Sequence, residues 1–101
     1  MNFVNSSIFP YSTNINSAGN LSIGGCDVVE MAQQYGTPLY VYDELTLRTK
    51  CQEFLSAFRS NYTNSSVIYA CKAFINPAIA SLLNEEGLGL DVVSGLSLIH
   101  I

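Results

Sequence analysis

The sequence predicts an α/β protein with parallel strands, and three observations lead to this fold class. Short strand-like runs occur at 39–42, 67–71 and 88–94, and the first is β-branched and aromatic. Segments with helical features separate them, at 43–60 and 76–86. The runs are almost uniformly apolar, as parallel strands covered on both faces are. Such alternation is typical of βαβ units, which fit either a doubly wound sheet or part of a (β/α)₈ barrel.

The amino-terminal part is expected to differ from the rest of the chain. Residues 1–20 are rich in Asn and Ser and show no clear period. Residues 21–23 predict a short strand that ends at two glycines. Asp27 and Glu30 have capping-box spacing, so we expect a helix from Asp27 to Tyr35.

The regular pattern begins after Pro38. Asp43 is expected to cap the first helix of this region, and Asn76 followed by Pro77 is a strong start for the second, which Gly87 ends. The first helix should bury one apolar stripe: Leu47, Cys51, Phe54, Leu55 and Phe58. Its outer face should carry Arg48, Lys50, Gln52 and Glu53.

Composition excludes several functional classes. The net charge of −4 provides no basic patch, which argues against nucleic acid as a partner. No secretory signal is visible, and no run approaches the ~18–20 apolar residues that a membrane span requires. Cys26, Cys51 and Cys71 lack CxxC spacing and are interpreted as reduced thiols in a cytoplasmic protein. The sequence gives no basis for a metal site.

Lys72 is the most conspicuous candidate for chemistry. It follows the apolar run 67–71, in which alternation places Ile68, Ala70 and Lys72 on one face. At the carboxyl end of a barrel strand, such a side chain would point into the active-site mouth. Partial burial there would favour the neutral amine that Schiff-base chemistry requires. From spacing alone, a strand-end lysine that reaches water is the simpler interpretation.

Asp91 is a second candidate within the run 88–94, which should neighbour the run 67–71. Its carboxylate could orient the Lys72 amine or steady its positive charge. A plain structural ion pair is the competing interpretation, and the residues alone do not separate the two.

Three motifs stand out along the chain: YGTPLYVYDE at 35–44, YACKAF at 69–74 and EEGLGLDVVSG at 85–95. In their order and spacing they resemble the diaminopimelate decarboxylases, members of the alanine-racemase-like (fold-type III) group of pyridoxal-phosphate (PLP) enzymes. The resemblance runs from residue 21 to 95. It implies an incomplete (β/α)₈ barrel of about three βα units, with the first segment packing into a β-rich second domain.

The resemblance also implies an activity and roles for two residues. Lys72 would be the Schiff-base lysine that holds pyridoxal 5'-phosphate, and Asp91 would match an acidic position close to it. The reaction would be decarboxylation of meso-2,6-diaminopimelate to L-lysine, in a homodimer. An ornithine or arginine decarboxylase or a racemase of the same group is the nearest alternative. A non-catalytic α/β module that binds a partner through its exposed strand edge is the alternative from another class.

The resemblance divides the chain into three parts. Residues 1–37 are expected to form the arm and 38–95 a partial PLP-binding barrel. Residues 96–101 depart from the family pattern and are expected to be a non-native tail. The family's phosphate-binding and substrate-binding positions come later in its pattern. We therefore expect the 101 residues alone to be marginally stable and inactive.

Overall fold

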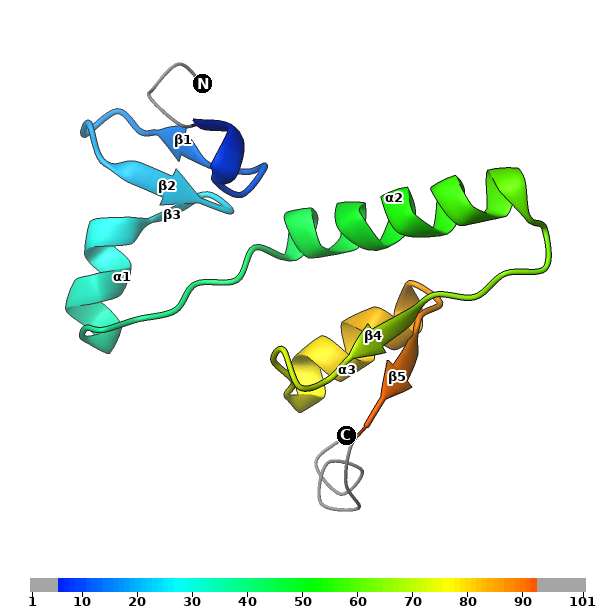
Figure 1. Ribbon diagram of the computed structural model, residues 1–101. Coiled ribbons are helices and arrows are strands. Elements are labelled where there is room, and N and C mark those ends of the chain that lie inside the picture. The colour runs from blue at the N-terminus through cyan, green and yellow to red at the C-terminus, as the bar shows by residue number, and fades with distance from the viewer. Residues whose placement is uncertain (1–5, 93–101) are drawn as a thin grey trace. The chain divides into compact units, whose positions relative to one another are not determined.

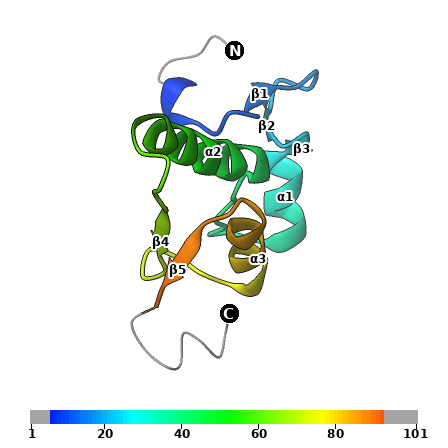
Figure 2. The ribbon, with the colours of Figure 1, turned by 90° about the vertical axis from the view of Figure 1, so that its right-hand side faces the viewer.

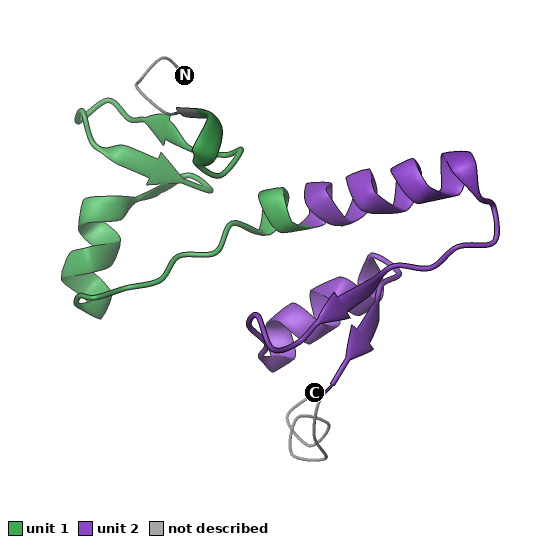
Figure 3. Ribbon diagram, viewed as in Figure 1, with its two compact units in different colours: residues 1–47 green, residues 48–101 purple. Residues whose placement is uncertain are grey.

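The computed structural model describes residues 6–92, which contain both helices and strands (Figure 1). The chain divides after residue 47 into two compact units (Figure 3). Helix α2 (Glu44–Asn61) begins in the first unit, and most of its length belongs to the second. Each unit is described separately below.

The first unit contains a small antiparallel sheet with the strand order β1-β2-β3. Strand β2 (Leu21–Ile23) confirms the strand predicted there. Its neighbours β1 (Asn14–Ile15) and β3 (Cys26–Asp27) were not predicted, because two-residue strands have no measurable period. Ser22 lies opposite residues of both neighbours. A short 3-10 helix, η1 (Ser6–Ile8), precedes the sheet.

Helix α1 (Val28–Tyr35) follows β3 directly and begins where the sequence predicts. The Asp27 carboxylate accepts hydrogen bonds from the backbone N–H groups of Val29 and Glu30, at 2.8 and 3.1 Å. Gly36, with a φ of 82°, ends the helix, and its N–H donates to the Ala32 carbonyl. Only glycine adopts this backbone conformation without strain, which explains why the predicted stop is correct.

The strand predicted at 39–42 is not found. These four residues pair with no strand in the range 6–92, and their side chains are exposed. Aromatic and β-branched residues favour an extended backbone, but a strand also requires a neighbour with which to form hydrogen bonds. The expected count of about three βα units is therefore not reached within the described residues.

The second unit contains one parallel βαβ unit, as the sequence predicts. Strand β4 (Ile68–Ala70) pairs in parallel with β5 (Gly89–Asp91), and α3 (Pro77–Glu85) connects them (Figure 2). The Asn76 side chain caps α3 by accepting the Ile79 N–H at 2.8 Å, and Pro77 occupies the first turn. The predicted continuation of β5 through residues 93 and 94 lies outside the described residues.

The apolar core of this unit gathers side chains from α2, α3 and the end of β4. Its members are Cys51, Leu55, Cys71, Ala80, Leu82 and Leu83. Phe54 and Phe58 were predicted to be buried with Cys51 and Leu55, but they are 56% and 51% exposed. The described neighbours of α2 cover one narrow side of the helix, so part of the predicted stripe is left in contact with solvent. No helix in the described range combines the length and apolarity that crossing a bilayer requires.

Candidate functional site

The two faces of the β4–β5 sheet differ in burial. Tyr69 and Leu90 are half-buried, and Cys71, just beyond β4, is buried. The alternating residues of the other face are exposed: Ile68, Ala70, Gly89 and Asp91. One face is therefore covered by the rest of the unit, while the other is left open.

Lys72 lies in the turn that follows β4, two residues beyond Ala70. Two hydrogen bonds shape this turn. The Ala73 N–H donates to the Ala70 carbonyl at 3.1 Å, and the Tyr69 hydroxyl donates to the Phe74 carbonyl at 2.6 Å. Both hydrogen bonds span Lys72 along the chain, and one of them is donated by a side chain of the preceding strand.

Asp91 lies at the end of the neighbouring strand, at the same edge of the sheet. It is in register with Ala70, and its carbonyl accepts the Cys71 N–H at 3.1 Å. The Asp91 side chain is exposed. Within residues 6–92, its carboxylate forms no hydrogen bond or ion pair with the Lys72 amine. The structure therefore brings the two candidates to adjacent strand ends without joining their side chains.

The Lys72 side chain is exposed, so the partial burial expected from the sequence is absent from the described residues. A sheet of two strands leaves one face without a cover, and a lysine at the edge of that face then meets solvent. The exposure of Lys72 fits both interpretations made from the sequence, because in a sheet of two strands a surface lysine and an active-site lysine would both be exposed. Lys72 therefore offers a primary amine that is accessible to a ligand.

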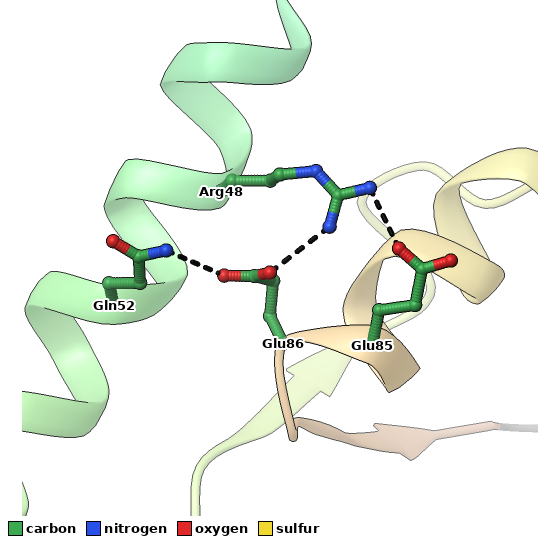
Figure 4. A network of polar contacts seen from close by, with 4 residues as sticks. All are labelled: Arg48, Gln52, Glu85 and Glu86. Atoms are coloured by element: carbon green, nitrogen blue, oxygen red, sulfur yellow. Dashed lines mark hydrogen bonds and ion pairs between the residues drawn. The ribbon is translucent and has the colours of Figure 1, made fainter.

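A polar network lies before β5, at the opposite end of that strand from Asp91 (Figure 4). The Arg48 guanidinium contacts Glu85 at 2.8 Å and Glu86 at 3.0 Å. The Gln52 amide donates to the second carboxylate oxygen of Glu86 at 3.0 Å. These bonds from Gln52 and Arg48 hold the pKa of Glu86 below its usual value. Gln52 is exposed, as predicted, but Arg48 is half-buried, so the prediction that Arg48 faces outward is wrong.

The paired glutamates of the EEGLGLDVVSG motif thus act in holding α2 against the end of α3. A signal for this was present in the sequence, since two adjacent acids at the carboxyl end of a helix are a poor match for the helix dipole unless cations neutralise them. Helical periodicity could not identify Arg48 as the partner, because it lies 37 residues before Glu85. In parallel α/β barrels, residues at this end of the strands serve stability rather than chemistry.

Asp43 is a third polar centre, within the first unit, and it is buried. Its carboxylate accepts the Thr46 N–H at 3.2 Å, as a helix cap should, and also bonds the Thr46 hydroxyl. It further accepts the Ser12 hydroxyl at 2.7 Å, and the Ser12 oxygen accepts the Gly24 N–H at 2.7 Å. Burial raises the pKa of Asp43, but the bonds from Thr46 and Ser12 outweigh it and lower the pKa below 3.8. The cap was predicted, whereas the link to Ser12 was not.

A comparison with protein families matches residues 46–99, more than half of the chain, to the pyridoxal-binding domain of pyridoxal-dependent decarboxylases. The match includes Lys72, Asp91 and the network around Arg48. The domain is defined by binding pyridoxal, and Lys72 supplies an accessible primary amine of the kind that an aldehyde cofactor requires.

Curated relatives carry the name diaminopimelate decarboxylase. That of Synechocystis sp. is 46% identical over 92 residues, which are 90% of this chain and 20% of the relative. That of Bacillus subtilis is 50% identical over 80 residues, 79% of this chain and 18% of the relative. That of Methanothermobacter thermautotrophicus is 49% identical over 80 residues, 79% of this chain and 19% of the relative. The chain spans about a fifth of the length of these relatives.

The parallel βαβ unit lies within the residues that match the family. The chain belongs to the pyridoxal-dependent decarboxylases and carries part of their pyridoxal-binding domain.

Proposed function

We propose that the full-length protein containing this chain is a PLP-dependent diaminopimelate decarboxylase, and that Lys72 is the lysine that holds the cofactor. The observation that carries the proposal is the position of Lys72 in the turn that follows a parallel strand, within the segment that matches a pyridoxal-binding domain. The chain has one other lysine, Lys50. It lies on helix α2, where its amine pairs with Glu53 at 3.3 Å. Barrel enzymes place their reactive groups at the carboxyl ends of strands, which favours Lys72.

The proposed roles of the two candidate residues follow from their places on the sheet. Lys72 would bind the cofactor through its amine, and Asp91 would orient that amine or balance its charge from the neighbouring strand end. Pyridoxal phosphate, when bound, supplies the electron sink for cleavage of the bond to the carboxylate. The turn bonds around Lys72 would limit the positions that its backbone samples.

The substrate proposed is meso-2,6-diaminopimelate, with L-lysine and carbon dioxide as products. The names of the relatives support this choice over ornithine or arginine. A (β/α)₈ barrel completed by later parts of the protein is proposed as the setting, because its remaining strands would cover the open face of β4 and β5. We also propose a cytoplasmic homodimer.

The test uses the full-length protein incubated with pyridoxal phosphate and reduced with borohydride, followed by peptide mapping. The label is expected on Lys72 and not on Lys50. Lys72→Ala should lose both the label and the decarboxylation of diaminopimelate, while the matched control Lys50→Ala should keep both. Label at another residue would overturn the assignment of Lys72, and no label would support a non-catalytic module.

The substrate is tested separately, by measuring carbon dioxide release from meso-diaminopimelate, ornithine and arginine with the same preparation. Diaminopimelate is expected to be the preferred substrate. Faster release from ornithine or arginine would overturn the substrate but leave the cofactor lysine in place. Racemisation without release of carbon dioxide would overturn the reaction type.

A further inference from the structure

The turn that carries Lys72 is tied at three points. Before Lys72, the Cys71 N–H donates to the Asp91 carbonyl of β5 at 3.1 Å. After it, the Ala73 N–H donates back to the Ala70 carbonyl at 3.1 Å. The third tie differs in kind, because it comes from a side chain: the Tyr69 hydroxyl donates to the Phe74 carbonyl at 2.6 Å.

Tyr69 belongs to the covered face of the β4–β5 sheet. It alternates with Ile68 and Ala70 and is half-buried, whereas those two neighbours are exposed. Its hydroxyl spans five residues along the chain and encloses the whole turn. Tyr69 is thus half-buried, while its hydroxyl makes an exposed bond that links the strand to the chain beyond Lys72.

We propose that Tyr69 is a positioning residue for Lys72, and this rests on the proposed function of that lysine. The phenol does not act on the amine itself. It fixes the Phe74 carbonyl, so that the turn presents Lys72 at the edge of the sheet in one backbone arrangement. Precise placement of a reacting group is a large part of what an active site contributes, and a shift of an ångström at such a position is costly.

Tyr69→Phe removes the hydroxyl and keeps the ring. The net contribution of one neutral hydrogen bond corresponds to a change of about 2- to 12-fold in an equilibrium constant. Binding of pyridoxal phosphate, which depends on the covalent bond to Lys72, should weaken by about that factor in the full-length variant. Binding of pyridoxine phosphate should be unchanged, because this analogue carries an alcohol in place of the aldehyde and cannot bond to the lysine.

The experiment measures both affinities by titration of the full-length wild-type protein, Tyr69→Phe and a control, Tyr62→Phe. Tyr62 is an exposed tyrosine of the same unit, just beyond α2, and its variant should bind both compounds as wild type does. Selective weakening of pyridoxal phosphate in Tyr69→Phe supports the proposal. Equal weakening of both compounds would show general damage to the pocket, and an unchanged variant would show that the bond is irrelevant. Either result overturns the role of Tyr69.

Failure of the proposed function would look different. Borohydride reduction of the wild-type protein would then place no label on Lys72, whatever Tyr69 does. If wild type is labelled at Lys72 and Tyr69→Phe shows the same half-saturation concentration for labelling, the cofactor lysine stands and the positioning role alone is wrong.

Discussion

Replacing Asp43 should loosen the small amino-terminal sheet from the start of helix α2. Asp43 is 7% exposed and accepts hydrogen bonds from Ser12 and Thr46, while the Thr46 hydroxyl oxygen accepts the Tyr11 N–H at 2.7 Å. In Asp43→Ala the helix cap is lost, at a cost of about 1 kcal/mol, and the stranded Ser12 hydroxyl adds about 1–3 kcal/mol. The total of about 3 kcal/mol corresponds to about a 100-fold change in local opening.

Hydrogen exchange of the full-length protein measures this opening directly. The amides of Tyr11, Gly24 and Thr46 report on the network, because each donates to one of its oxygens. Their protection should fall by about 100-fold in Asp43→Ala, and by less in Asp43→Asn, which keeps one oxygen for the cap. The control is Asp27→Ala, which removes the cap of α1 and should expose the Val29 amide without affecting Thr46.

The same network predicts a dependence on pH. The pKa of Asp43 in the folded chain is lower than its ordinary value of 3.8. Its contribution to stability is therefore complete above that ordinary value and disappears as the pH falls through the lowered pKa. The difference in protection between wild type and Asp43→Asn should shrink on acidification. A difference that stays constant down to acid pH, or unchanged protection in Asp43→Ala, would refute the role given to this carboxylate.

Three further predictions concern the polar network of the second unit, the reactivity of the cysteines and the stability of the 101-residue chain. Glu86→Gln should raise hydrogen exchange in the last turn of α3 more than Glu85→Gln does, because the Glu86 side chain is 14% exposed and has two partners, whereas the Glu85 side chain is 57% exposed. Iodoacetamide should alkylate Cys26 faster than Cys51 in the native protein, as judged by peptide mapping, since burial, and secondarily the charge of Glu86, raise the pKa of the Cys51 thiol. The 101-residue polypeptide by itself should melt without cooperativity, as followed by circular dichroism, because its described core has no large side chain that is fully buried.

Local signals in the sequence identify the correct boundaries where one side chain decides the outcome. Asp27 and Asn76 each accept backbone N–H groups at a helix start, and Gly36 takes a backbone conformation that suits glycine. The parallel pairing of β4 and β5 was also predictable, because a strand, a helix and a strand joined by short turns leave few other arrangements.

Features that depend on distant partners were not predictable. Residues 39–42 have the composition of a strand but pair with no other strand within the described residues. The strand predicted there from composition is therefore wrong. Arg48 was assigned to the outer face because helical periodicity does not reveal that two carboxylates lie beside it. The strand of Asp91 was correctly placed beside the strand that precedes Lys72, but the bond from Tyr69 to Phe74 has no sequence pattern of its own.

The EEGLGLDVVSG motif contains a residue that serves packing and a candidate site residue, and they lie at opposite ends of one strand. Glu86 lies before β5, and its side chain links α3 to α2 through its bonds with Arg48 and Gln52. Asp91 lies at the far end of the same short strand, exposed and beside the turn of Lys72. Because a parallel strand separates these ends, a substitution at Glu86 should change stability. A substitution at Asp91 should instead change how Lys72 binds the cofactor. A loss of cofactor affinity from Glu86→Gln in a protein that unfolds like wild type would show that the two ends are not independent.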